Sequence, residues 1–181
     1  MRRKLADCLI EVTKGVGADW HKYRVLGATR DGLALAKEPV GKSPERYKLV
    51  EPGTVFYNPM RIMIGSIAML DDDGEPGITS PDYVVLRTRD GILHPRWFYY
   101  WLRSASGEEL IKSLARGAVR ERMLFSRLAV GEIDLPPWED QLRGAGQLAE
   151  VARARAALIE KLAVLDRLPA AILSKTSRVS K

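Results

Sequence analysis

The chain has 181 residues, 46% of them hydrophobic, which suits one domain with a core plus an appendage but scarcely two domains. Its 29 Lys and Arg against 23 Asp and Glu give a net charge of +6, which fits a polyanion such as nucleic acid, although a basic protein without such a partner has the same balance. The single cysteine, Cys8, excludes an internal disulfide, and no apolar run is long enough for a signal peptide or membrane helix. We therefore expect a cytoplasmic protein that makes no membrane contact.

Short apolar runs separated by turn residues predict that residues 1–136 form one mixed, β-rich domain. Runs at 23–26 and 33–36 flank Asp31-Gly32, a pair typical of hairpin turns. Runs at 54–57 and 62–64 flank Asn58-Pro59, and runs at 67–70 and 83–86 flank an acidic loop at 71–81. We expect each run to be a strand and each flanked segment to be a turn or loop.

A helical pattern follows the strands. Pro95 suits a first helical turn, a second helix is predicted from Gly107 to about Gly117, and residues 130–135 resemble a last strand. Helical spacing places Trp97, Tyr100 and Trp101 on one side, where they could stack on bases or pack into the core. We favour core packing.

Residues 137–173 are predicted to form one long helix. Pro136-Pro137 ends the preceding segment, and acidic residues 139–140 favour a helix start. Apolar spacing alternates between three and four, with Arg155 as the one polar interruption, at Leu148, Val151, Leu158, Leu162 and Leu165. Residues 138–168 would span roughly 45 Å, Pro169 should end or kink the helix, and 174–181 should be a frayed tail. The apolar stripe could pack on the chain's own domain or on a second helix, and the length of the stripe favours a second helix.

The sequence contains no residue pattern typical of a metal site, a phosphate-binding loop or a catalytic site. His21, His94 and Cys8 are far apart in sequence, so no metal-ligand spacing exists, and Gly15 and Gly17 complete no phosphate-binding loop. We expect no metal, no cofactor and no catalytic residue.

Basic and amide side chains gather in three predicted loops, and such side chains bind phosphates and base edges. Each cluster alone also fits a solvated surface. The candidates are Lys37, Lys42 and Arg46 in the first loop, Tyr57, Asn58 and Arg61 in the second, and Arg116, Arg120 and Arg122 in the third.

The order of several motifs resembles the target recognition domain of type I restriction-modification specificity subunits, over residues 5–168. The motifs are Tyr57-Asn58-Pro59-Met60-Arg61, Gly65-Ser66-Ile67, Gly77 with Ser80-Pro81-Asp82-Tyr83, Gly117-Ala118-Val119-Arg120, and Ile133-Asp134-Leu135-Pro136-Pro137 with Gln141. The resemblance implies an α+β fold, a target recognition domain followed by one long coiled-coil helix. It adds Ser66, Ser80 and Tyr83 to the candidates for DNA contact.

In that family, two recognition domains on two long helices each read half of a split DNA site. This chain has one of each, so the resemblance implies a half subunit, either natural or a piece of a longer one. It implies double-stranded DNA, a methyltransferase subunit and a restriction subunit as partners, with a homodimer formed through the helix.

Two other functions remain open. The chain could be the recognition end of a fused type II methyltransferase-nuclease, or an interaction adaptor that binds no DNA. The start at Met1 and the end after the helix favour a self-contained chain over the fused enzyme.

Overall fold

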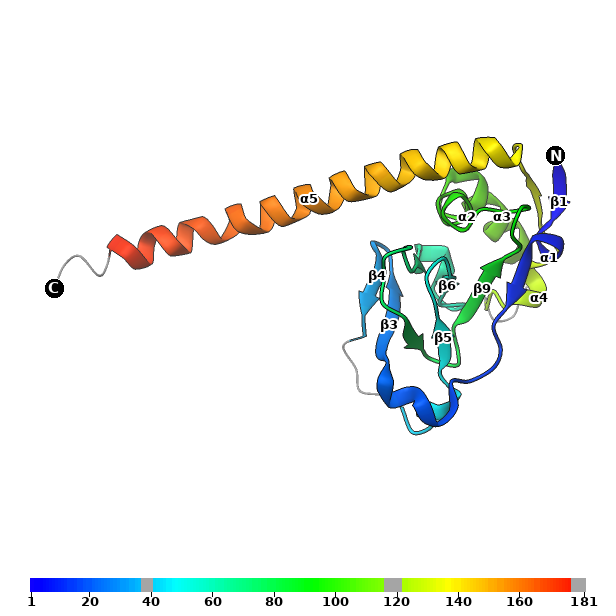
Figure 1. The fold of residues 1–181 in the computed structure, drawn as a ribbon, viewed down its shortest axis with the longest axis horizontal. Coiled ribbons are helices and arrows are strands. Elements are labelled where there is room, and N and C mark those ends of the chain that lie inside the picture. Colours follow the sequence, from blue (N-terminus) through cyan, green and yellow to red (C-terminus); the bar gives the residue numbers. More distant parts are fainter. Residues whose placement is uncertain (37–40, 116–121, 177–181) are drawn as a thin grey trace.

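Two four-stranded sheets form the centre of the computed structural model, which describes residues 1–36, 41–115 and 122–176 (Figure 1). The first sheet is antiparallel, in the order β2 (Leu9–Glu11), β9 (Val84–Thr88), β6 (Val55–Tyr57) and β7 (Ile67–Met69). The second has the order β4 (Gly32–Leu35), β3 (Arg24–Thr29), β8 (Gly77–Thr79) and β5 (Lys48–Val50), with β3 and β8 parallel. A short pair, β1 (Arg2–Lys4) and β10 (Glu132–Asp134), joins the two ends of the domain.

The first sheet is buried on both faces, which explains why its strands are continuous apolar runs. Successive side chains of a strand point to opposite faces. Accordingly, Val55 and Tyr57 of β6 join one core cluster, whereas Phe56 between them joins a second cluster with Leu26 and Val50 of the other sheet. The first cluster lies against the helices and the second between the two sheets.

Helices cover the outer face of the first sheet. They are α1 (Leu5–Cys8), α2 (Pro95–Leu102), α3 (Ala105–Ala115) and α4 (Phe125–Leu128). Pro95 lies in the first turn of α2, as predicted. Phe98 and Leu102 are buried, and Trp97 and Trp101 pack against the same cluster, so the expected core role is confirmed for these two tryptophans. The third predicted aromatic residue, Tyr100, is half-buried and does not belong to this cluster.

The strand at residues 62–64 was a wrong prediction. Ile62–Ile64 is a 3-10 turn that buries Ile62 and leaves Met63 and Ile64 exposed. It ends at Gly65, whose φ of +83° is a left-handed conformation that glycine adopts without strain. The turn closes the connection between β6 and β7, where Tyr57 pairs with Ile67.

The acidic segment at 71–81 is not only a loop. Its second half contains β8, which pairs with both β3 and β5 inside the second sheet. Three residues, Gly77-Ile78-Thr79, offered too short a run to be recognised, yet all three are buried. The 31–32 hairpin, in contrast, is confirmed by the antiparallel pairing of β3 with β4.

The chain ends in α5 (Trp138–Thr176), a single helix that begins against the domain and then extends away from it (Figure 1). The helix does not end at Pro169, because this proline lies inside it. The α+β fold with one long C-terminal helix is therefore as predicted, but the helix is longer than expected.

Candidate nucleic-acid interface

The 3-10 turn Pro44–Arg46 forms one side of a groove of about 310 Å³ on the domain surface. Arg46 and its acidic neighbour Glu45 line this groove with Thr13, Gly15, Lys48 and Pro81. A β-bridge between Gly15 and Lys48 holds the N-terminal segment beside this turn. Two of the motifs seen in the sequence, around residues 42–46 and 80–83, are thus neighbours in the fold.

The third basic loop joins this surface through two contacts. Arg122 forms an ion pair with Asp82, with 3.6 Å between the guanidinium and the carboxylate. The Met123 amide donates a hydrogen bond of 3.0 Å to the Pro59 carbonyl, in the turn that also carries the exposed Arg61. We call Lys42, Arg46, Arg61 and Arg122 the basic strip.

Most cations of the basic strip are not neutralised by neighbours. Lys42, Arg46 and Arg61 are exposed, and no carboxylate among the described residues forms an ion pair with them. Unpaired cations at a surface are the groups that replace the counterions of a phosphate backbone. These three cations can therefore contact a polyanion without first breaking an ion pair, whereas Arg122 would have to share its guanidinium with Asp82.

Two predicted contact residues lie in the interior. Tyr57 is fully buried, and burial raises the pKa of its hydroxyl. Ser66 is buried and donates a 2.6 Å hydrogen bond to the Ala28 carbonyl, which ties the two sheets together. Neither side chain can reach DNA from these positions, so both are corrected to scaffold residues.

Three other predicted residues have structural contacts of their own. Asn58 accepts a 2.9 Å hydrogen bond from the Met60 amide, and Ser80 accepts one of 3.4 Å from the Asp82 amide, so both shape their turns. The Tyr83 ring packs against Phe56 with 6.0 Å between centroids. All three are half-buried, which leaves part of each side chain at the surface.

Lys48 differs from the cations of the strip because it is almost fully buried. Its ammonium donates a 2.7 Å hydrogen bond to the Tyr83 carbonyl. Burial lowers the pKa of Lys48, while Glu11 and Asp82 act in the opposite direction. Lys48 therefore braces β5 against the start of β9 rather than meeting a ligand.

Three predicted residues, Lys37, Arg116 and Arg120, lie outside the described residues. Two residues that the sequence did not predict, Lys14 and Trp20, lie beside the basic strip. The 3-10 turn Gly17–Lys22 contacts the turn of Arg46 and carries the half-buried Trp20, and the exposed Lys14 precedes the bridged Gly15. No sequence signal separates Lys14 or Trp20 from ordinary surface residues, because only the bridge to Lys48 brings them here.

A second feature fixes the start of α5. Gln141 is 1% exposed; its carbonyl accepts a 3.0 Å hydrogen bond from the His94 amide, and its amide nitrogen donates to the carbonyls of Ile92 and Pro136, both at 3.1 Å. One side chain thus ties α5 to the segment before α2. Burial lowers the pKa of His94 in the same place.

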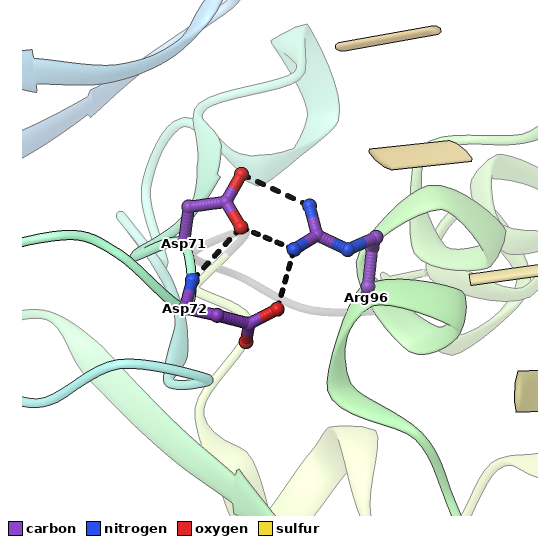
Figure 2. Close-up of polar contacts among 3 residues, drawn as sticks. All are labelled: Asp71, Asp72 and Arg96. Atoms are coloured by element: carbon purple, nitrogen blue, oxygen red, sulfur yellow. Dashed lines mark hydrogen bonds and ion pairs between the residues drawn. The ribbon is translucent and has the colours of Figure 1, made fainter. Parts of the chain in front are cut away.

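An ion cluster lies beside α5 as well. Arg96 of α2 is 5% exposed and donates hydrogen bonds to both oxygens of Asp71, one of them at 2.9 Å, and to Asp72 at 2.7 Å (Figure 2). The Arg96 hydrogen bond holds the pKa of the Asp71 carboxyl below its usual value, and Arg153 of α5 acts in the same direction. The cluster holds the loop after β7 against α2.

The predicted helix stripe is mostly uncovered. Leu148 is half-buried, whereas Val151, Leu158, Leu162 and Leu165 are each 57–60% exposed. Only the first part of α5 packs on α2. The alternative in which the whole stripe lies on its own domain is therefore wrong.

Within residues 1–36, 41–115 and 122–176, no three His, Cys, Asp or Glu side chains are grouped to hold a metal ion. None of the helices described there combines the length and apolarity needed to cross a bilayer.

No protein-family model and no curated protein sequence matches the chain. Among the solved structures that share its fold are two from type I R-M systems. The HsdS subunit from Thermoanaerobacter tengcongensis superposes with a TM-score of 0.61 and 19% identity over 97% of this chain and 47% of that one. A chain from a study of complex assembly and conformational transition of the type I R-M system gives a TM-score of 0.58 and 18% identity, over 99% and 47%. The chain thus spans about half the length of these structures, and the predicted resemblance is confirmed for the fold.

Proposed function

We propose that the chain is a DNA-specificity module of a type I restriction-modification system, in which residues 1–136 read DNA and α5 sets the spacing between half-sites. The observation that carries this proposal is the fold: nearly the whole chain superposes on about half of an HsdS subunit. A half of that length holds one recognition domain and one helix.

The surface chemistry supports the same function. The basic strip gathers loops from three parts of the chain on one surface, and its exposed cations suit phosphate contacts. Arg61 and Arg46 have the forked guanidinium that pairs with guanine in the major groove. Lys37, Arg116 and Arg120 are proposed to extend the strip.

One such domain reads only a short half-site and buries little surface, so tight specific binding requires a second domain. We propose that two copies pair through the stripe from Leu148 to Leu165, with the helices antiparallel and the domains at opposite ends. Two-fold symmetry then gives an interrupted palindrome, with half-sites on the order of one helical turn, about 10 bp, apart.

The chain itself is proposed to be non-catalytic and cytoplasmic. Methyl transfer and cleavage would belong to a separate methyltransferase subunit and a restriction subunit that the module directs to its site. One of the two similar structures comes from a study of complex assembly in the type I R-M system, which supports a role beside partner subunits.

Selection from a randomised duplex library tests the proposal. The purified chain should enrich one interrupted palindrome, and its affinity should fall steeply with salt. Retention of duplexes without any enriched sequence would leave only non-specific binding, and no duplex binding at low salt would favour the adaptor function instead. The purified chain should also transfer no methyl group and cut no DNA; methyl transfer by the chain alone would contradict the non-catalytic role.

A further inference from the structure

A cleft of about 650 Å³ lies between α5 and the domain, just before the helix leaves it. One wall is Ala152, Arg155, Ala156 and Ile159 of α5, and the others come from α2, β4 and β7. Leu33 of β4 lines both this cleft and a second one of about 390 Å³ along the edge of the sheet. Leu33 and Leu35 are exposed on this edge strand, so an apolar surface continues from α5 onto β4.

We propose that this cleft receives the distal part of α5, residues 161–170, from a second copy of the chain. The inference rests on the proposed pairing through α5 and adds a contact between the helix of one copy and the recognition domain of the other. Each domain would then be held by two helices, its own and that of its partner copy.

Charge complementarity favours this occupant. Asp31 and Asp71 line the cleft together with Arg96 and Arg155. The exposed Asp72 and Asp73 follow Asp71 on the same loop, so carboxylates outnumber cations there even though Arg96 pairs with Asp71 and Asp72. The sequence from residue 165 to the end has one acidic and four basic residues. Arg167 is exposed there, between the exposed Leu165 and Leu168. An apolar segment with basic flanks therefore meets an apolar cleft with an acidic rim.

The stripe also gives a consistent register. If Leu158 of one copy packs against Leu162 of the other in an antiparallel pair, residues 152–159 of the first lie opposite 161–168 of the second. Arg155, the cation of the cleft wall, then lies beside Leu165 and Asp166 of the second copy. Parallel pairing in register would instead place Arg155 against Arg155 and both domains at the same end, so the antiparallel arrangement is favoured.

Cross-linking between two separately prepared variants tests the contact. One preparation carries Leu33→Cys and the other Leu165→Cys or Leu168→Cys, so that only a contact between copies gives a disulfide. The native Cys8 is buried and is the same in every sample. Val130→Cys is the matched control, because Val130 is exposed on the turn after α4, which lies across the domain from β4 (Figure 1). We expect cross-linked dimers with Leu33→Cys and none above background with Val130→Cys.

Charge reversal provides a second measurement. Asp31→Lys and Arg167→Glu should each raise the dissociation constant of the dimer about two- to thirtyfold, because an exposed ion pair contributes about 0.2–1 kcal/mol and occurs twice in a symmetric dimer. Combining both reversals should restore much of the affinity. Dimers of unchanged affinity without the Leu33 cross-link would overturn the cleft contact but leave the pairing of helices intact. A wild-type chain that is monomeric at micromolar concentration would overturn both.

Discussion

Arg46 lies at the rim of a groove, on a short turn between two strands, and forms no ion pair among the described residues. If its guanidinium meets a phosphate, Arg46→Ala should reduce the slope of log affinity against log salt by about 0.9. Arg143→Ala is the matched control, since Arg143 is equally exposed but lies on α5 and pairs with Asp140. Titration of duplex binding at several salt concentrations measures both. An unchanged slope in Arg46→Ala would remove this residue from the interface.

The contacts of Asp71 predict how the stability of the protein depends on pH in acid. The hydrogen bond from Arg96 holds its carboxyl pKa below the ordinary 3.8, so the charged form is favoured by folding. The resulting stability is fully present above pH 3.8 and is lost as the pH falls through the lower folded value. Asp71→Asn should therefore show a smaller loss of unfolding free energy between about pH 6 and about pH 2.5 than the wild type.

Asp73→Asn is the control for this effect, because Asp73 is the exposed neighbour on the same loop. Its acid dependence should match that of the wild type. Denaturant unfolding at the two pH values measures all three proteins, and an Asp71→Asn variant with the full wild-type acid dependence would show that the Arg96 cluster does not stabilise the loop.

At the scale of single residues, the sequence could predict which loops carry charge but not which side chains face outward. Arg61 and Tyr57 belong to the same motif, yet one is exposed and the other buried. Tyr57 is buried because β6 has a core on each of its two faces, which requires knowing that helices cover the second face, whereas Arg61 lies in the turn after the strand. Lys14 could not be found because its place depends on a bridge between residues far apart in sequence.

The Gln141 side chain connects α5 to the domain, so its loss should weaken the attachment of the first turn of this helix. Gln141→Ala would leave the amide of His94 and the carbonyls of Ile92 and Pro136, all in half-buried residues, without this partner. An unsatisfied buried group costs about 1–3 kcal/mol, and because these groups are only half-buried the unfolding free energy should fall by about 1 kcal/mol. Gln147→Ala, at an exposed position of the same helix, should change it by less than about 0.5 kcal/mol. Equal effects of the two substitutions would contradict an anchoring role for Gln141.

Among the elements of the described residues, apolar runs and helical periodicity predicted α2, α3 and α5 and the strands β3, β4, β6, β7, β9 and β10. They missed the four-residue helices α1 and α4 and the strands β1, β2, β5 and β8, which offered no apolar run of sufficient length, and one predicted strand is instead the 3-10 turn Ile62–Ile64. Pro169 was expected to interrupt α5, but a proline removes only one hydrogen bond and its local cost of about 3 kcal/mol need not end a helix of this length.

The whole molecule is unusual in that a long apolar stripe leaves its own domain. Two charges within this stripe, Leu158→Glu with Leu162→Glu, should give a monomer with unchanged helix content at the domain, because both side chains are exposed and contribute nothing to the core. Val164→Glu is the control, since Val164 is equally exposed but about 140° away around the helix from the stripe. Sedimentation velocity at micromolar concentration should find dimers for the wild type and the control only.

A dimer of Leu158→Glu/Leu162→Glu as tight as the wild type would mean that the stripe is not the interface. The packing of the chain determines what contacts a core residue, but it does not determine what contacts an exposed stripe. The sequence therefore predicted the stripe, and the fold shows it uncovered, whereas its pairing remains a proposal that this measurement decides.

The most direct test of the proposed half subunit maps methylated bases in DNA from cells that express the chain together with the methyltransferase that co-purifies with it. We expect methylation at one interrupted palindrome, whose two halves are identical and inverted, and its loss when the chain is deleted. An asymmetric methylated site, or a site that is unchanged without the chain, would contradict it.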